Sequence, residues 1–269
     1  MSSKYIFIWV LGIALLAGCE EQFDWQLSID EDDLLVVDAV ITNENKNHLI
    51  RLTKTYKEQN QSPSPASGAF VAIFTETDTI FTVETPPGSG LYYTDSMHAV
   101  VDKLYVLGIL HNGKQYHAYD FQEPGEPLDN TSLYRPVSEG VYTINFHDSG
   151  DNPNYIEYDL NWQGVGNCSE PIDCQAKQIY FDLKNIDVND QFKPDQERVD
   201  FPAGTVIIRR KYSVSRRYKE YLRGMLSETA LRGGLFDAFP ANAASNLSEG
   251  AVGFFAVSTV VTDTTIVVE

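Results

Sequence analysis

Apolar and polar residues alternate in short runs between residues 34 and 121, which predicts β-strands rather than helices. Asn112-Gly113 separates the last two runs and suits the type I′ turn of a tight hairpin. Seven short strands without a helical period predict an immunoglobulin-like or transthyretin-like β-sandwich over residues 34–124. The expected strands span 34–41, 48–56, 69–74, 78–83, 91–94, 103–111 and 114–119.

A second β-rich block is expected over residues 131–269, after a boundary around Pro124 and Pro127. Its runs at 140–146, 155–162, 177–183, 205–208, 253–261 and 264–268 predict strands. Apolar residues recur at helical spacing only over about 213–231, where Ser215 is a suitable N-cap. The predicted fold class is therefore mainly β, with a β-rich C-terminal domain that holds one α-helix.

The first 18 residues have the pattern of a signal peptide, with Lys4 before an apolar run at 5–17. This run is shorter than the ~20 residues that a membrane-spanning helix needs. Leu16-Ala17-Gly18-Cys19 resembles a bacterial lipobox, in which Cys19 becomes the lipidated first residue of the mature protein. A transmembrane anchor or an uncleaved signal is the alternative. Residues 19–33 are acidic and predict a tether between the lipid and the first domain.

Acidic residues outnumber basic ones by 38 to 20, which gives a formal net charge of −18. Phosphates would be repelled, so general nucleic-acid binding is not expected. The same charge argues against an electrostatic hold on anionic lipid, and we expect the protein to meet the membrane through the lipid on Cys19.

Of the three cysteines, Cys168 and Cys174 remain once Cys19 is assigned to the lipid. In an oxidising envelope compartment these two are expected to form a small disulfide loop. A zinc site would need two further soft ligands, and none lies near them in the sequence. We therefore predict a structural disulfide and no metal site.

Basic residues cluster in one stretch of this acidic chain. The cluster is a candidate docking patch for an acidic partner or for lipid headgroups. The alternative is a solvated helix face whose long side chains cover the edges of the core. The candidate residues are Arg209, Arg210, Lys211, Arg216, Arg217, Lys219 and Arg223.

A loop with several side-chain oxygens is a weak calcium candidate, formed by Asp148, Asp151, Asn152 and Asn154. The spacing of an EF-hand is absent, so an acidic turn between strands is the favoured interpretation. The 15 Tyr and 14 Phe residues could line a glycan- or peptide-binding face, although filling the core is the more usual role of such residues in β-sandwiches.

No catalytic motif is present in the chain after residue 19. A Gly-x-Ser-x-Gly elbow, a His-Glu-x-x-His helix and a Ser-x-x-Lys pair are all missing. A pair of carboxylates that meet only in space stays open, because its two members need no fixed spacing in the sequence. We therefore assign no catalytic residue and expect no cofactor.

Four short stretches carry a family signal, at 35–41, at 90–118, at 148–155, and at 236–242 with Asn246 and 253–258. Together they resemble a family of Bacteroidota envelope lipoproteins, the domain of unknown function 4249. The resemblance implies an outer-membrane lipoprotein that is often encoded beside TonB-dependent receptors, and it brings no catalytic residues. Glu20-Glu21 also resembles the acidic signal that sends lipoproteins of this phylum to the cell surface.

These features predict a non-enzymatic, lipid-anchored outer-membrane protein that faces the cell surface. It would serve as an accessory or binding component of a TonB-dependent transporter. A surface adhesin or structural coat protein is one alternative, and a hydrolase acting on glycan or peptide is another. The sequence does not name a small-molecule or glycan ligand.

Overall fold

The computed structural model describes residues 34–55, 62–129, 132–147, 150–165, 168, 170–183, 198–229 and 244–269. The chain divides into two units, Met1–Asp32 and Asp33–Glu269, and the description below concerns the second. The predicted signal peptide, Cys19 and the tether lie outside the described residues. Within the described ranges, no helix has both the length and the apolar character needed to span a membrane.

The fold is mainly β with one α-helix, as the sequence predicts. All seven strands expected between residues 34 and 121 are present. The strands of this half are β1 (Leu35–Thr42), β2 (Leu49–Lys54), β3 (Phe70–Phe74), β4 (Thr79–Glu84), β5 (Leu91–Thr94), β6 (Leu104–His111) and β7 (Lys114–Phe121). The later elements are β8 (Tyr134–Ser138), β9 (Val141–Ile144), β10 (Asn154–Asn161), the 3-10 turn η2 (Pro171–Cys174), β11 (Gln175–Asp182), β12 (Asp200–Pro202), β13 (Val206–Ser213), α2 (Arg216–Thr229), β14 (Ala251–Ser258) and β15 (Val260–Ile266).

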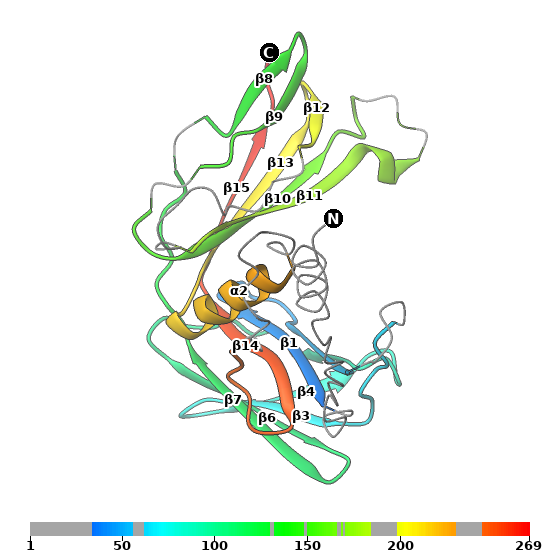
Figure 1. Cartoon of the computed structure of the whole chain (residues 1–269), viewed down its shortest axis with the longest axis vertical. Helices are drawn as coiled ribbons and strands as arrows, with labels where there is room; N and C mark the ends of the chain where they lie inside the picture. The colour runs from blue at the N-terminus through cyan, green and yellow to red at the C-terminus, as the bar shows by residue number, and fades with distance from the viewer. Residues whose placement is uncertain are drawn as a thin grey trace, which may run out of the picture. The chain divides into compact units, whose positions relative to one another are not determined.

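Eight strands form the largest sheet, in the order β14-β1-β2-β5-β4-β3-β6-β7 (Figure 1). Its buried residues make one apolar cluster that includes Leu35, Ile50, Ile73 and Leu107. Strand β4 pairs with both β5 and β3 and so makes the eight strands one continuous sheet, in a sandwich-like arrangement around this cluster.

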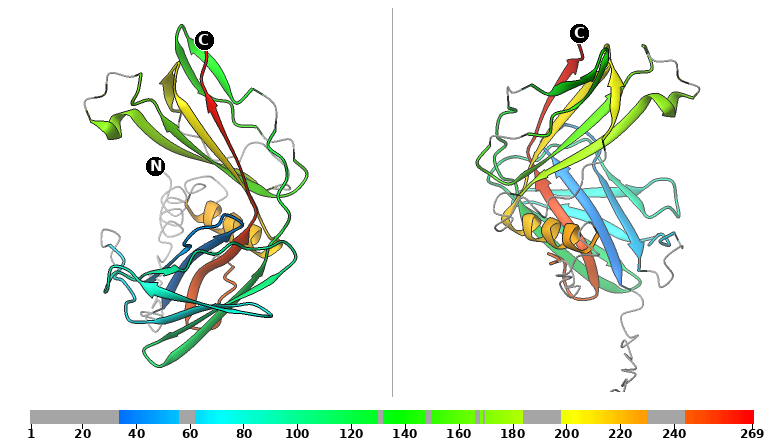
Figure 2. Two further views of the ribbon diagram at one scale, coloured as in Figure 1. Left: turned by 180° about the vertical axis from the view of Figure 1, so that it is seen from behind. Right: turned by 45° about the horizontal axis from the view of Figure 1, so that its top comes forward.

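Strand β14 comes from the C-terminal part of the chain and pairs in parallel with β1, a position visible in every view (Figures 1 and 2). Gly253 lies opposite Val37 with φ +96°, and a Cβ there would stand 2.0 Å from the Val37 carbonyl oxygen. Only glycine allows this approach of the two backbones. Strand pairing thus crosses the expected boundary between 34–124 and 131–269, while the division into two folding domains stays a prediction.

A four-stranded sheet with the order β11-β10-β13-β15 and a three-stranded sheet with the order β12-β9-β8 build the other part of the unit. A second apolar cluster contains residues from both sheets, among them Tyr142 and Ile144 of β9, and Tyr158, Leu160 and Ile207 of β10 and β13. Buried apolar side chains between two sheets are the usual core of such a layered arrangement.

Helix α2 lies within the predicted range 213–231 and begins at Arg216, because β13 continues to Ser213. The Ser215 hydroxyl accepts a hydrogen bond from the Tyr218 N–H at 3.2 Å, as expected of an N-cap. The buried face of the helix joins a third apolar cluster, in which Tyr218 stacks on Phe254 of β14 and meets Tyr155 of β10 edge to face. The helix therefore ties the eight-stranded sheet to the four-stranded sheet.

Candidate functional site

The outward side of β4, β3, β6 and β7 forms a continuous apolar surface, which we call the aromatic face. Residues directly opposite one another in antiparallel strands lie on the same side of a sheet. The pairs Phe70 with Leu110, and Phe74 with Val106, therefore share this side. The complete set is Phe70, Ala72, Phe74, Thr79, Phe81, Val83, Leu104, Val106, Gly108, Leu110, Gln115, His117, Tyr119 and Phe121.

Several large side chains on the aromatic face are exposed to solvent. Phe81 is 58% exposed and Val83 is 66% exposed, and Phe70 is similarly open. The rings of Phe70 and Phe81 contact each other with their centroids 5.8 Å apart. Soluble monomers rarely expose a contiguous apolar patch of this kind, and such patches mark interaction sites.

Gly108 makes the centre of the aromatic face flat. A Cβ at this position would lie 2.7 Å from a ring carbon of Phe74, so the absence of a side chain lets the Phe74 ring lie across β6. A strand glycine at a point of close approach is a recurrent device in sheets. The Phe74 ring therefore covers β6 at Gly108 and continues the apolar surface across the two strands.

Charge is excluded from the aromatic face, although the chain carries 38 Asp and Glu residues. None of the face positions is Asp, Glu, Lys or Arg, and His117 is the one basic side chain among them. Arg217 of α2 contacts the face at Tyr119. Its guanidinium carbon lies 4.2 Å from the Tyr119 ring centroid, and the guanidinium donates a hydrogen bond to the Tyr119 hydroxyl. Depletion of charge with enrichment of aromatic residues is the composition found at the core of protein interfaces.

A cavity of about 700 Å³ adjoins the aromatic face at Phe81 and Leu104. The β3–β4 turn and residues 95–105 form its walls, so it lies at one end of the sandwich. Apolar walls come from Ile80 and Val100, while Glu76, Asp95 and His98 supply polar groups. Ten of its sixteen lining residues are polar or charged, whereas small-molecule sites are mostly apolar, so we assign no ligand to this cavity.

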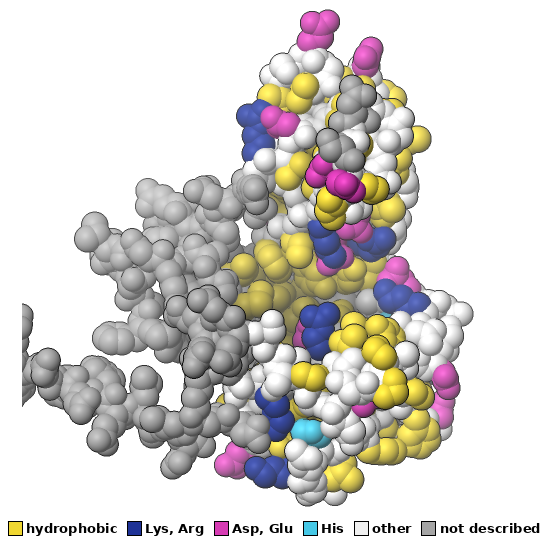
Figure 3. Space-filling view, turned by 90° about the vertical axis from the view of Figure 1, so that its right-hand side faces the viewer, with side chains coloured by type: hydrophobic (Ala, Val, Ile, Leu, Met, Phe, Trp, Pro, Cys, Tyr) yellow, Lys and Arg dark blue, Asp and Glu magenta, His cyan; other side chains and the backbone are white. Residues whose placement is uncertain are grey.

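The predicted basic patch divides into two groups. The three residues on β13 have carboxylate partners, since Arg209 pairs with Asp263 at 2.6 Å, Arg210 with Asp159, and Lys211 with Glu126 at 3.6 Å. Lys and Arg side chains next to Asp or Glu are also visible on the side shown in Figure 3. Arg209, Arg210 and Lys211 are poorly suited to docking a partner, because each already forms an ion pair with a carboxylate of the same chain.

The helical members of the patch are Arg216, Arg217, Lys219 and Arg223 of α2. Arg216 and Arg217 are exposed, and Arg217 is engaged by Tyr119. The hypothesis that a basic patch docks an acidic partner stays a prediction, and it now rests on this helix.

Two described members of the calcium candidate, Asp151 and Asn152, are joined by a residue that the sequence did not suggest. The backbone N–H groups of Asp151 and Asn152 both donate to Oε1 of Glu126 at 3.1 Å, and the Asn152 amide donates to the same oxygen at 2.7 Å. The loop thus turns donors toward a carboxylate, which favours the acidic-turn interpretation. Asp148 lies outside the described residues. Among those described, no three His, Cys, Asp or Glu side chains gather as metal ligands would.

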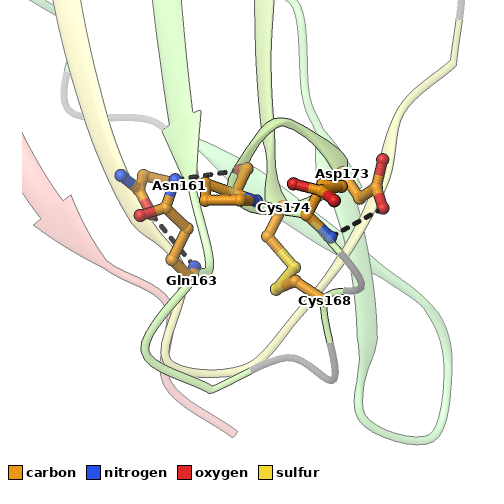
Figure 4. Close-up of a disulfide and its surroundings, with 7 residues drawn as sticks. Asn161, Gln163, Cys168, Asp173 and Cys174 are labelled. Carbon is orange, nitrogen blue, oxygen red and sulfur yellow. Dashed lines mark hydrogen bonds between the residues drawn. A yellow bond between two sulfur atoms is a disulfide. The ribbon is translucent and has the colours of Figure 1, made fainter.

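Cys168 and Cys174 form a disulfide with their Cα atoms 5.7 Å apart (Figure 4). Cys174 is buried at the end of η2, directly before β11. Its carbonyl accepts a hydrogen bond from the Trp162 N–H at 2.9 Å, which connects the loop to the end of β10. The disulfide therefore closes the loop between two paired strands, as expected of a structural staple.

One carboxyl group has a strongly perturbed pKa, yet its position is structural. Burial raises the pKa of Asp120 from 3.8 to about 6. The carboxylate accepts a hydrogen bond from the Val257 N–H at 3.0 Å and another from the Ser215 hydroxyl. Asp120 therefore joins β7 to β14 and to the start of α2, inside the protein.

A sequence model described as "Domain of unknown function (DUF4249)" matches residues 20–264. The chain belongs to this family. The match includes every described strand except the last two residues of β15, so the DUF4249 region comprises the aromatic face, helix α2 and the disulfide loop. No curated protein matches the chain.

Proposed function

We propose that this DUF4249 protein is a lipid-anchored envelope protein that binds another protein through the aromatic face. In this proposal it is a non-enzymatic accessory or binding component of a TonB-dependent transporter in the outer membrane. The lipobox-like Leu16-Ala17-Gly18-Cys19 supports lipidation at Cys19. Glu20-Glu21 supports an orientation toward the cell surface.

The observation that carries the proposal is the exclusion of charge from an exposed sheet face in a chain of net charge −18. A face that served only to keep the protein soluble would carry its share of carboxylates. Exposed rings such as Phe70 and Phe81 would gain free energy when a partner removes them from water, by about 25 cal/mol for each Å² of apolar surface. The partner surface should therefore be apolar at its centre.

The proposal is tested by affinity purification of the full lipidated chain from its own membranes. Phe70→Asp and Phe81→Asp together place two carboxylates at the centre of the face. We expect this variant to recover at least about tenfold less of the TonB-dependent receptor than the wild type, since desolvating a charge opposes binding. Ile172→Asp is the matched control, because Ile172 is exposed on η2, far along the chain from the face.

Recovery of the receptor by neither the wild type nor the control would contradict the transporter proposal. Equal recovery by the wild type and the double variant would contradict the role of the aromatic face. The melting temperatures of the variants must stay close to that of the wild type for either result to count. Protease treatment of intact cells tests the orientation, and a protected chain would overturn the surface-facing part.

The alternatives make different predictions. An adhesin or structural coat protein would bind host or matrix material in cells that lack the transporter. A hydrolase acting on glycan or peptide would show turnover on a panel of such substrates. It would lose that turnover on mutation of a cleft carboxylate, for which Glu76 and Asp95 of the cavity are the candidates.

A further inference from the structure

Strand β15 is an outer strand of the four-stranded sheet and pairs with β13 on one side (Figure 1). Successive residues of an edge strand turn their backbone groups alternately toward the neighbour and away from it. The Thr259 carbonyl accepts a bond from the Ser213 N–H, and the Val267 N–H donates to the Thr205 carbonyl. The odd-numbered residues therefore bond to the sheet, and the even-numbered residues point away from it.

The outward backbone groups of β15 are satisfied at one end of the strand and open over the rest. The Asn43 side chain accepts from the Val260 N–H at 2.7 Å and donates to the Val260 carbonyl at 3.3 Å. The outward N–H and C=O groups of Thr262, Thr264 and Ile266 bond to no described residue. All three residues are exposed, and Ile266 is 60% exposed.

Several other strand edges in the described chain carry protection that β15 lacks. The Asn246 amide bonds to Tyr119 of β7 and to Phe255 of β14, which closes the space between the two ends of the eight-stranded sheet. Strand β8 contains Pro136, and β12 ends at Pro202. Proline and covering segments are the usual means of preventing edge-to-edge association. Strand β15 has no Pro, no Lys and no bulge between Val260 and Ile266.

We propose that the open edge of β15 pairs with β15 of a second copy of this chain, antiparallel about a two-fold axis at Thr264. In this register Thr264 lies opposite the partner's Thr264, and Thr262 lies opposite the partner's Ile266. Each of these positions is a hydrogen-bonded pair that exchanges two N–H···O bonds. The pairing satisfies every open backbone group of the edge and joins two four-stranded sheets into one.

The side chains of β15 favour a second copy as the occupant. Thr–Thr neighbours are favourable cross-strand pairs, and Thr and Ile are both β-branched residues that suit strands. Asp263 is the one charged residue of the strand, and Arg209 holds its carboxylate at 2.6 Å. In the proposed register Asp263 faces the partner's Thr265, and the two Asp263 carboxylates are diagonal neighbours, each paired with Arg209 of its own copy. A strand with a neutralised charge is where two chains of net charge −18 can approach.

The proposed interface is small, since only three residues of each copy form backbone pairs. Stable interfaces bury about 1,600 Å² in total, and a short edge pairing falls well below this value. We therefore expect a weak dimer, which is best detected by trapping it covalently. The test uses the full chain in the membrane fraction of the cells that produce it.

Thr264→Cys places two cysteines opposite each other across the two-fold axis. The Cα atoms of a hydrogen-bonded pair are about 5.5 Å apart, within the range that a disulfide spans. Mild oxidation should therefore give a cross-linked dimer on a non-reducing gel. Thr262→Cys is the matched control, because the two introduced cysteines would be four positions apart along the paired strands, about 14 Å at about 3.4 Å per residue. We expect its cross-linking to be at least about tenfold slower, and equal rates would overturn the proposal.

A second variant set tests the edge itself. The double variant Thr262→Cys with Ile266→Cys should also cross-link, because position 262 of each copy lies opposite position 266 of the other. Adding Thr264→Pro removes an outward N–H that the fold does not use, so the dimer should be lost while the melting temperature changes little. Persistence of the cross-link would exclude edge pairing. Cross-linking of Thr264→Cys to a different protein in these membranes, in place of a second copy, would also overturn the proposal.

Discussion

The eight-stranded sheet and the four-stranded sheet handle their exposed parts in opposite ways. The eight-stranded sheet covers its edges with the Asn246 segment and leaves one apolar face open. The four-stranded sheet carries paired charges on its faces, such as Arg209 with Asp263 and Lys177 with Glu157, and leaves an edge open at β15. An open face offers side-chain contacts, whereas an open edge offers backbone hydrogen bonds.

This difference indicates two kinds of association in one chain. An apolar face gains free energy from removing rings from water and suits a partner of complementary shape. An edge gains its specificity from register, so a strand with a matching pattern is the natural partner. The two surfaces are carried by different sheets, and changes to one should leave the other intact.

Among the substitutions that test this comparison, Lys211→Ala in the four-stranded sheet should lower the free energy of unfolding the most. Lys211 is 2% exposed, and its ammonium group bonds to the Pro127 carbonyl and pairs with Glu126. Removing Lys211 takes the cation from a largely buried ion pair and leaves Glu126 with only its neutral donors from Asp151 and Asn152, which costs about 4 kcal/mol of the free energy of unfolding. Urea denaturation of the full chain at neutral pH measures this loss.

Arg216→Ala is the control for that prediction. Arg216 is exposed on α2, and surface substitutions of this kind change the free energy of unfolding by less than about 0.5 kcal/mol. Equal losses for the two variants would show that the charges of the four-stranded sheet do not stabilise it in the way its ion pairs suggest.

The next largest effect is a pH dependence of stability that comes from Asp120, a carboxyl buried in the eight-stranded sheet. Burial raises its pKa from 3.8 to about 6 in the folded protein. The folded state therefore binds a proton more tightly than the unfolded state, so the group's stabilising contribution is complete below pH 3.8 and is lost as the pH rises through about 6. Two pKa units correspond to about 3 kcal/mol.

The difference between wild type and Asp120→Asn isolates this group from the other carboxylates. We expect the wild type to lose up to about 3 kcal/mol relative to the variant between pH 4 and pH 7. The asparagine oxygen still accepts the Val257 N–H, so the joint between β7 and β14 is kept. Parallel stability curves for the two proteins across this range would show that Asp120 is not desolvated.

Local features of this fold could be predicted from the sequence because neighbouring residues determine them. The seven early strands follow from alternation, and Asn112 and Gly113 adopt the positive φ values that their hairpin turn requires. The Ser215 cap and the Cys168–Cys174 disulfide also depend on residues only a few positions apart.

Pairings over long distances could not be predicted in the same way. Strand β14 joins β1 across about two hundred residues, and alternation within a strand does not say which strand will be its neighbour. The partners of Arg209 and Lys211 are likewise remote, which made a patch of mostly paired charges resemble a docking site. The aromatic face had a weak sign in Phe70-Val71-Ala72-Ile73-Phe74, a strand apolar on both sides.

The last prediction tests whether the edges of the eight-stranded sheet are protected by Asn246. Its amide donates to the Tyr119 and Phe255 carbonyls at 3.1 and 2.8 Å and accepts from the Phe255 N–H at 3.1 Å. Asn246→Ala leaves three backbone groups without these partners, for an expected loss of about 2 kcal/mol in the free energy of unfolding.

Ser96→Ala, which removes one exposed hydrogen bond to Asn45, should cost less than about 0.5 kcal/mol. Because Asn246→Ala also opens the edges of β7 and β14, it should increase concentration-dependent aggregation in a light-scattering assay, whereas Ser96→Ala should not. A variant that loses stability without aggregating would mean that Asn246 holds the strands together but does not protect them. The open edge of β15 in the four-stranded sheet would then be the remaining support for the contrast with the eight-stranded sheet.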